Sequence, residues 1–373
     1  MMLHYAQSSK LKTKKIVFDA NYATSDSVTL EHFKELSSKR RAVEEFINER
    51  RSITEATTRE VTRGLVSHYE QDSHKIEQYI PLLENLFFYV GDISTNNRMA
   101  QWTTALKIRW SSGLTTSSFF NLSGLKFFQI DNLRFELGMT LFLYGGILRE
   151  RASELLSTDL VQSSIFSRQA AGIYYHLAHD VLPRLQPMLP SEKPSEALAE
   201  VSTIMSLICL AEAQAAAVRR AEEKGTSPSL LAKLHHGVAL FLEEAMAIFS
   251  TVVKQYKHIS PRLLEFISSC KSLHELKGQE YVAQCLKASD QIGAAIAVLR
   301  SGLVNAKKKI PGEESWKSIY QKQIHDSSEV LRKIEHENYV VWSQKIPSIN
   351  ELPLPEEIGW PKVLPELCYM KWE

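Results

Sequence analysis

Hydrophobic side chains recur at helical spacing over most of the chain. Leu30, Phe33, Leu36 and Val43 begin this pattern, which continues with interruptions to Phe87. From Asn132 onward the same periodicity extends almost to the carboxyl-terminal tail. Long helices are expected at about residues 132–158, 163–187, 195–223, 228–256, 261–287, 290–308 and 313–343. The sequence therefore predicts a mainly α protein.

One segment in the first third of the chain has the pattern of a strand instead. Residues 106–110 alternate apolar and basic side chains with a period of two, which is typical of a β-strand. A second strand is expected within residues 119–130 and a short one at residues 15–19. The sequence thus predicts a small sheet of two or three strands beside the helices.

Glycine and proline residues divide the helical region. The run from Gly225 to Pro228 is a stop-and-restart signal, because glycine ends one helix and proline fits the first turn of the next. Five prolines between residues 347 and 365 predict an extended tail. Small residues between 274 and 306 indicate a helical hairpin of the tetratricopeptide type.

These elements suggest one domain that covers residues 1–373. Its three parts are residues 1–130 with the first helices and the small sheet, residues 131–345 with a helical solenoid, and residues 346–373 with the extended tail. Antiparallel helices stacked in this way form curved, extended binding surfaces.

Charge and composition argue against several classes of function and location. The 44 basic and 43 acidic residues give a net charge of +1, which argues against a nucleic-acid partner. The start of the chain has no signal-peptide pattern, and the longest apolar stretch, residues 137–148, is too short to span a membrane. Met2 excludes myristoylation, and Cys368 lies sixth from the end rather than fourth, so no prenylation is expected. We therefore expect a cytoplasmic protein.

No arrangement of residues indicates catalysis. The chain lacks glycine-rich phosphate loops and the G-x-S-x-G motif, and its four cysteines form no C-x-x-C pair. His176 and His179 lie three residues apart on a helix beside Asp180, but no third ligand is evident, so no metal is predicted. His235 and His236 are adjacent and point in different directions. We expect no enzyme activity, no cofactor and no small-molecule substrate.

The chain resembles the BRO domain family of endosomal-targeting modules. The resemblance begins at the run Phe135-Glu136-Leu137-Gly138-Met139 and ends before the tail, and its stretches appear in the family's order. The stretches are residues 135–139, 169–177, 182–185, 210–214, 230–234 and 337–347. This resemblance implies a banana-shaped helical solenoid with a tetratricopeptide-like core, a small sheet and an extended tail.

The resemblance also implies a function and a site. The family binds the carboxyl-terminal amphipathic helix of an ESCRT-III subunit in an apolar groove, so we expect an adaptor in endosomal sorting that is recruited peripherally to endosomes. The groove positions fall at Ala217, Leu230 and Leu234. Leu230 and Leu234 lie four residues apart and share one helix face, although core leucines have the same spacing. Close relatives carry a bulkier residue at Ala217, and Ala215 stands where the family often has glutamate.

Two rival interpretations remain open. The departures at Ala215 and Ala217 also suit a helical scaffold that kept the fold and changed its protein partner. The basic run of Lys307, Lys308 and Lys309 suits a peripheral binder of anionic membranes, because each such charge contributes about 1 kcal/mol at an anionic surface. Basic runs that serve only solubility are also common on protein surfaces.

Overall fold

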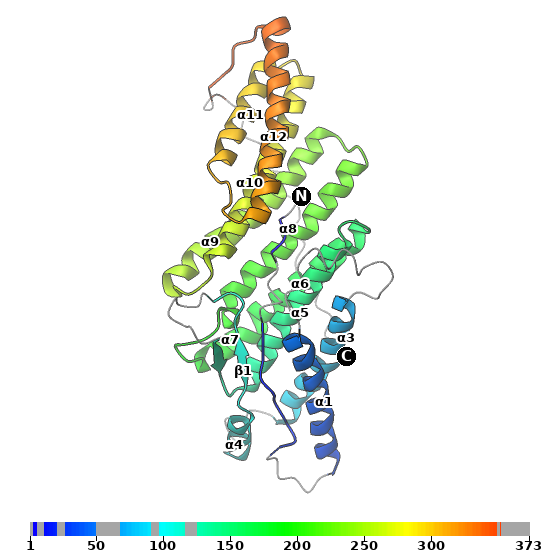
Figure 1. The fold of residues 1–373 in the computed structure, drawn as a ribbon, viewed down its shortest axis with the longest axis vertical. Coiled ribbons are helices and arrows are strands. Elements are labelled where there is room, and N and C mark those ends of the chain that lie inside the picture. The colour runs from blue at the N-terminus through cyan, green and yellow to red at the C-terminus, as the bar shows by residue number, and fades with distance from the viewer. Residues whose placement is uncertain are drawn as a thin grey trace.

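The computed structural model describes residues 3–5, 11–20, 27–49, 68–90, 97–115, 125–348 and 351. Within them the chain forms an elongated stack of helices, with the first helices at one end and the last at the other (Figure 1). The longer helices are α1 (Ser27–Glu49), α3 (His68–Val90), α4 (Asn97–Leu106), α5 (Leu133–Leu155), α6 (Leu160–His176), α8 (Ala199–Glu223), α9 (Pro228–Gln255), α10 (Pro261–Ala288), α11 (Ile292–Lys307) and α12 (Glu314–Glu337).

Shorter helical turns complete the described chain. They are η3 (Leu177–Val181), α7 (Leu182–Leu185), η4 (Gln186–Met188), η5 (Ser195–Ala197) and η6 (Asn338–Trp342). The turns η3 and η6 are π-helical, and Ser343, the residue that follows η6, has a left-handed backbone with φ of 51°.

A two-stranded antiparallel sheet lies at the amino-terminal end. Strand β1 (Arg109–Ser111) pairs with β2 (Phe127–Gln129), and Thr13 forms an isolated bridge to Trp110. Beneath the sheet, the Arg40 guanidinium lies 2.5 Å from Glu136, and both side chains are buried. The Trp110 indole also donates to Glu136, so one carboxylate on α5 fixes α1 and the sheet together.

The solenoid body is built by helices that each pack on the next, from α5 through α6, α8, α9, α10 and α11 to α12. Close approach of α5 and α6 requires a glycine. A Cβ at Gly145 would lie 2.8 Å from the ring of Tyr174, and the Tyr174 hydroxyl donates to the Phe142 carbonyl at 3.2 Å. Most of α5 is buried, as expected for a helix near the centre of such a stack.

The amino-terminal segment is threaded into this body. Leu3 and Tyr5 are almost completely buried. Arg149 on α5 donates to the Tyr5 carbonyl at 2.8 Å, and the Trp316 indole on α12 donates to the His4 carbonyl at 2.8 Å. His4 and Tyr5 therefore connect α12 with α5.

The predicted fold class is confirmed: the structure is mainly helical with a small sheet. The strand expected at residues 15–19 is wrong, because these residues form no strand and the bridge to β1 lies just before them, at Thr13. The strand expected at residues 106–110 begins at Arg109, since α4 extends to Leu106. The tail of residues 346–373 lies mostly outside the described residues.

Two described helices, α8 and α9, are long and apolar enough to cross a membrane by length and composition alone. This is weak support for a span, because the core helices of folded proteins have the same composition. The apolar window of α8 is 72% buried within the structure.

Candidate protein-interaction surface

The turn between α8 and α9 forms where glycine and proline predict it. Gly225 has a left-handed backbone with φ of 68°, a conformation that glycine adopts without strain. The Thr226 amide donates to the Ala221 carbonyl at 3.1 Å, and the Gly225 amide donates to the Glu222 carbonyl at 3.0 Å. This pair of hydrogen bonds is a Schellman motif. The two helices therefore form a tight antiparallel hairpin.

A side-chain amide fixes the register of this hairpin. Gln214 on α8 donates to the Leu234 carbonyl on α9 at 2.8 Å. Its amide lies over Gly237, where a Cβ would come within 2.3 Å of the Gln214 nitrogen. Ala217 follows Gln214 by about one turn and Leu230 precedes Leu234 by one turn, so antiparallel packing brings Ala217 and Leu230 to the same end of the hairpin.

The structure places the three predicted groove residues at different depths. Ala217 is exposed and Leu230 is 40% exposed, whereas Leu234 is 7% exposed and belongs to the core. Ala217 and Leu230 are thus available to a partner, and Leu234 supports the helix beneath them. Ala215 is buried.

Helix α6 adds two exposed apolar residues that the sequence did not single out. Val161 is 40% exposed and Ile165 is 39% exposed. The Ser164 hydroxyl donates to the Ala213 carbonyl on α8 at 3.1 Å, one turn from Ala217. The spacing of four residues between Val161 and Ile165 indicates that they share one face of α6. The sequence does not show that this face is the exposed one, because the opposite face of α6 is apolar as well. We call Val161, Ile165, Ala217 and Leu230 the docking surface.

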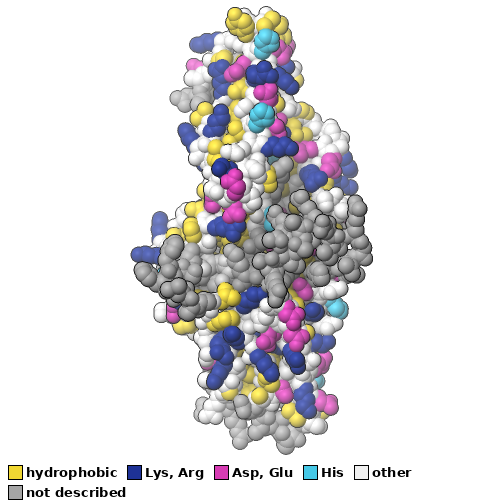
Figure 2. Space-filling model, in the orientation of Figure 1, with side chains coloured by type: hydrophobic (Ala, Val, Ile, Leu, Met, Phe, Trp, Pro, Cys, Tyr) yellow, Lys and Arg dark blue, Asp and Glu magenta, His cyan; other side chains and the backbone are white. Residues whose placement is uncertain are grey.

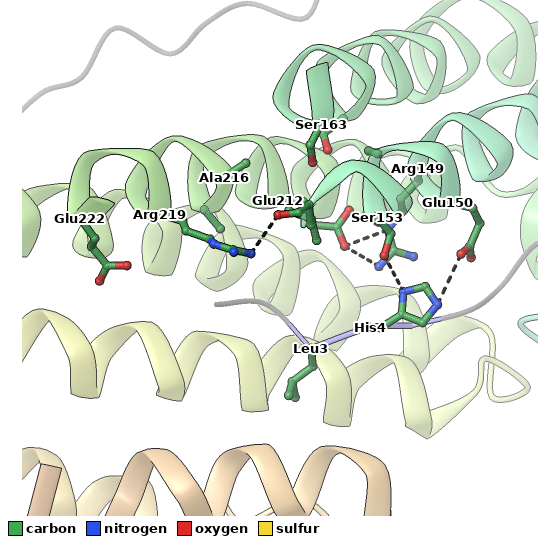
Figure 3. A pocket seen from close by; sticks show the side chains of 14 residues that line it. Leu3, His4, Arg149, Glu150, Ser153, Ser163, Glu212, Ala216, Arg219 and Glu222 are labelled. Carbon is green, nitrogen blue, oxygen red and sulfur yellow. Dashed lines mark hydrogen bonds and ion pairs between the residues drawn. The ribbon is translucent and has the colours of Figure 1, made fainter. Parts of the chain in front are cut away.

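The opposite side of α8 lines a cavity of about 320 Å³ (Figure 3). Its charged groups are paired: Arg149 lies 2.6 Å from Glu212, and His4 lies 3.4 Å from Glu150. Burial would lower the pKa of Arg149, but the charge of Glu212 outweighs it and raises that pKa. These pairs hold the amino-terminal segment in place, and the Ser153 hydroxyl on α5 lies 3.3 Å from His4 Nδ1.

A buried polar cluster connects α8, α9 and α10. His235 and His274 approach within 3.0 Å through their Nδ1 atoms, and His235 Nε2 lies 3.4 Å from Glu222. The Tyr281 hydroxyl donates to Glu222 at 2.8 Å. Burial lowers the pKa of His235. Burial alone would raise the pKa of Glu222, but the hydrogen bonds from His235 and Tyr281 prevail and lower it to about 2.

The histidines considered as metal ligands have other partners. His176 Nδ1 lies 2.8 Å from Asp180, and the His179 ring stacks on Tyr175 with centroids 4.0 Å apart. In the described ranges, no group of three or more histidine, cysteine, aspartate or glutamate side chains is placed to hold a metal ion.

Basic residues are dispersed among acidic ones over the visible face of the described chain (Figure 2). Lys307, Lys308 and Lys309 are an exposed exception at the carboxyl-terminal end of α11. No ion pair with another described residue engages these three lysines.

The fold and the residues of the docking surface define a helical solenoid scaffold with exposed apolar side chains on three neighbouring helices. The sequence profile of the BRO1-like domain matches residues 10–367, and the chain therefore belongs to the BRO1-like domain family. The family resemblance predicted from the sequence is confirmed.

Curated relatives and solved structures agree with this assignment. The BRO1 domain-containing protein BROX of Mus musculus is 24% identical over 310 residues, which are 78% of this chain and 71% of the mouse protein. The human BROX protein is 28% identical over 211 residues, which are 52% of this chain and 50% of that protein. The pH-response regulator protein palA/RIM20 of Aspergillus oryzae is 23% identical over 82% of this chain and 38% of its own length.

Among solved structures, the ALIX BRO1 CHMP4C complex matches with a TM-score of 0.69 and 17% identity over 95% of this chain and 94% of that chain. A second solved structure, which gives the structural basis for endosomal targeting by the Bro1 domain, matches with a TM-score of 0.66. Its identity is 16% over 94% of this chain and 88% of that chain. At these identities the likeness shows the fold, which both structures share with this chain.

Proposed function

We propose that this protein is an adaptor that docks the carboxyl-terminal amphipathic helix of an ESCRT-III subunit during endosomal sorting. The observation that carries the proposal is the exposed apolar docking surface on a BRO1-like fold. The ALIX BRO1 domain, which has this fold, has been solved in complex with CHMP4C, and this supports an ESCRT-III subunit as the kind of partner.

The chemistry of the docking surface suits a helix. An amphipathic helix presents apolar anchors every three to four residues, and it binds where a receiving surface offers apolar side chains over a similar length. Val161, Ile165 and Leu230 provide such side chains, and the small Ala217 lies toward the same end of the α8–α9 hairpin as Leu230. An anchor of the partner helix would cover Ala217 and contact Leu230. Leu234 would contribute by holding α9 in place.

The proposed role is protein binding without catalysis. The charged side chains of the cavity beside α8 are engaged in ion pairs, and the buried histidines are engaged with one another and with Glu222. We propose a cytoplasmic location with peripheral recruitment to endosomes through the ESCRT-III partner, and no nucleic acid or small molecule as ligand.

Peripheral binding to anionic membranes is a second candidate, favoured by the exposed Lys307, Lys308 and Lys309. It predicts binding to anionic vesicles that weakens as salt rises, because exposed charges are screened within about 10 Å at 0.1 M ionic strength. A changed protein partner on the same surface is the other alternative, and it predicts that ESCRT-III peptides do not bind.

The deciding experiment is fluorescence anisotropy with a labelled carboxyl-terminal peptide from each ESCRT-III subunit. We expect micromolar binding to at least one peptide. Leu230→Asp should weaken it about thirtyfold, since an interface hot spot contributes about 2 kcal/mol. Val304→Asp is the matched control, because Val304 is 53% exposed on α11, away from the docking surface. Equal binding by Leu230→Asp and the wild type would refute the site, and no binding to any peptide would favour another partner.

A further inference from the structure

A second groove lies along α10, between the first turns of α9 and the second half of α11. Its volume is about 540 Å³, and it shares no lining residue with the cavity of Figure 3. Val282 and Leu286 lie four residues apart on one face of α10 and are partly exposed, with the buried Leu276 beneath the groove, and Gly302 lies on the α11 side. This volume is within the range of about 300–1,000 Å³ typical of ligand sites.

The groove contains a polar group without a partner. A Cβ at Gly302 would lie 2.0 Å from Gln279 Oε1, so glycine leaves room for the Gln279 amide. Gln279 Oε1 is buried and accepts no hydrogen bond within the part of the chain described. A buried carbonyl oxygen without a donor is costly, and a donor supplied by a ligand would remove that cost.

The uncompensated charge of the groove is positive. The lining carboxylate of Glu275 forms an ion pair with Lys271 at 2.9 Å. Lys233 lines the groove from α9 and forms no ion pair with any described residue. Charge complementarity therefore favours an acidic ligand.

The position of Gln279 decides the conformation of the ligand backbone. In the interior of a helix each backbone N–H group is already bonded to a carbonyl, so it is not available to Gln279. An extended segment keeps its N–H groups available for such a bond. Ser229 and Lys233, which line the groove, flank Leu230 in the sequence, so the groove begins next to the docking surface.

From these observations we infer that the groove is a second peptide-binding site, for an extended acidic segment of a partner protein with alternating apolar side chains. Its apolar side chains contact Val282 and Leu286, its carboxylates pair with Lys233, and one backbone N–H donates to Gln279 Oε1. This site goes beyond the helix-docking surface and does not depend on it.

The test is selection of peptides from a phage-displayed library of random dodecapeptides on the purified full chain. Affinities of the selected peptides are then measured with Val282→Asp, and with Val304→Asp as the matched exposed control on α11. We expect a set of peptides that is lost in Val282→Asp, retained in Val304→Asp, and enriched in aspartate and glutamate. Absence of such a set, or a set rich in lysine and arginine, overturns the proposal.

Two further variants keep the result independent of folding defects in Val282→Asp. Lys233→Glu should weaken the selected peptides about tenfold, whereas Lys254→Glu, an exposed charge reversal in the last turn of α9, should leave them unchanged. Gln279→Leu should weaken them by up to about tenfold through loss of one hydrogen bond. Unchanged affinity in both Lys233→Glu and Gln279→Leu overturns the proposed contacts.

One variant and one competition experiment distinguish binding in the groove from binding at the docking surface or by the chain's own tail. Ala217→Asp should not alter the selected peptides, although it disrupts the docking surface. Peptides that depend on Ala217 and not on Val282 occupy the docking surface, in which case the groove proposal fails and the proposed function stands. If a synthetic peptide of residues 349–373 displaces every selected peptide at lower concentration, the occupant is the chain's own tail and the proposal of an external partner fails.

Discussion

His235 and His274 face each other inside the protein with their Nδ1 atoms 3.0 Å apart. Both rings are about 1% exposed, and they join α9 to α10. Since one Nδ1 atom must donate and the other must accept, the pair is satisfied when both rings are neutral. His235 also contacts Glu222 through Nε2 and stacks on the Tyr281 ring. Lys277 on α10 opposes a positive charge on His235.

This pair predicts that the protein loses stability as the pH falls below about 6.5, the ordinary histidine pKa. Burial lowers the pKa of His235 in the folded state, so the unfolded chain takes up a proton first and the free energy of unfolding decreases with pH. Urea titrations at pH 7, 6 and 5 measure the slope. His235→Asn should flatten it, while His236→Asn, which changes the neighbouring groove residue, should not. Parallel slopes for the wild type and His235→Asn would contradict the assignment.

Glu222 should produce a separate effect at lower pH. Its pKa is lowered to about 2, so the stability that it contributes is complete above its ordinary pKa of about 4.3 and is lost as the pH falls toward 2. Tyr281→Phe removes one of the hydrogen bonds that lower this pKa. We expect the variant to lose less stability than the wild type between pH 4.5 and 2.5, measured by urea unfolding, provided that both remain folded at pH 4.5. An identical loss would show that Tyr281 does not determine the pKa of Glu222.

Arg149→Met should destabilise the protein by about 3–5 kcal/mol, because it leaves the Glu212 carboxylate partly buried without its partner. It also removes the donor to the Tyr5 carbonyl. Arg219→Met is the control, since Arg219 is exposed and its ion pair with Glu223 should contribute less than about 1 kcal/mol. Chemical denaturation of both variants measures the difference, and comparable losses would mean that the buried pair has no special role.

Gly145→Ala should destabilise the α5–α6 contact by about 1–3 kcal/mol, because the new Cβ would lie 2.8 Å from the buried Tyr174 ring. Gly312→Ala provides a matched substitution at an exposed position, where the nearest atom is the Glu265 Oε1 at an ordinary 3.4 Å. Thermal unfolding compares the two variants. If both melt at the wild-type temperature, the helices can separate without cost and the close packing is not required.

Leu234→Ala and Leu230→Ala should have opposite consequences. Leu234 is buried, so its truncation should cost about 2–5 kcal/mol of stability. Leu230 is 40% exposed, so its truncation should leave stability within about 0.5–1 kcal/mol and weaken partner binding instead. Denaturation and peptide binding, measured on the same two variants, check both outcomes. A stability loss in Leu230→Ala equal to that in Leu234→Ala would show that both leucines serve the core.

The same leucines show what the sequence can and cannot predict. The turn at Gly225 and Pro228 is predictable because its causes are local: a left-handed backbone and a fixed proline φ angle. Helical spacing shows that Leu230 and Leu234 share a face of α9. It does not show how deeply each one lies, since depth depends on α8 and on the Gln214 side chain that crosses from it.

Hydrophobic periodicity does not predict contacts between distant segments of the chain either. Residues 15–19 have a composition suitable for a strand, but the described amino-terminal segment pairs with β1 only before them, at Thr13. The groove along α10 depends on Gly302 and Gln279, which lie on different helices and carry no recognisable motif.

The threaded amino terminus has a consequence for how the chain folds. Helical solenoids usually fold by adding each repeat to its neighbour, so that the two ends of the array form independently. Here the bond from the Trp316 indole to the His4 carbonyl spans 312 positions of the sequence. During synthesis the first residues cannot make this contact until nearly the whole chain has left the ribosome. Such a long-range contact carries a large loop-closure cost and slows folding. The native body is therefore completed late and as a unit. Its amino-terminal residues cannot pair with α12 before α12 has been synthesised.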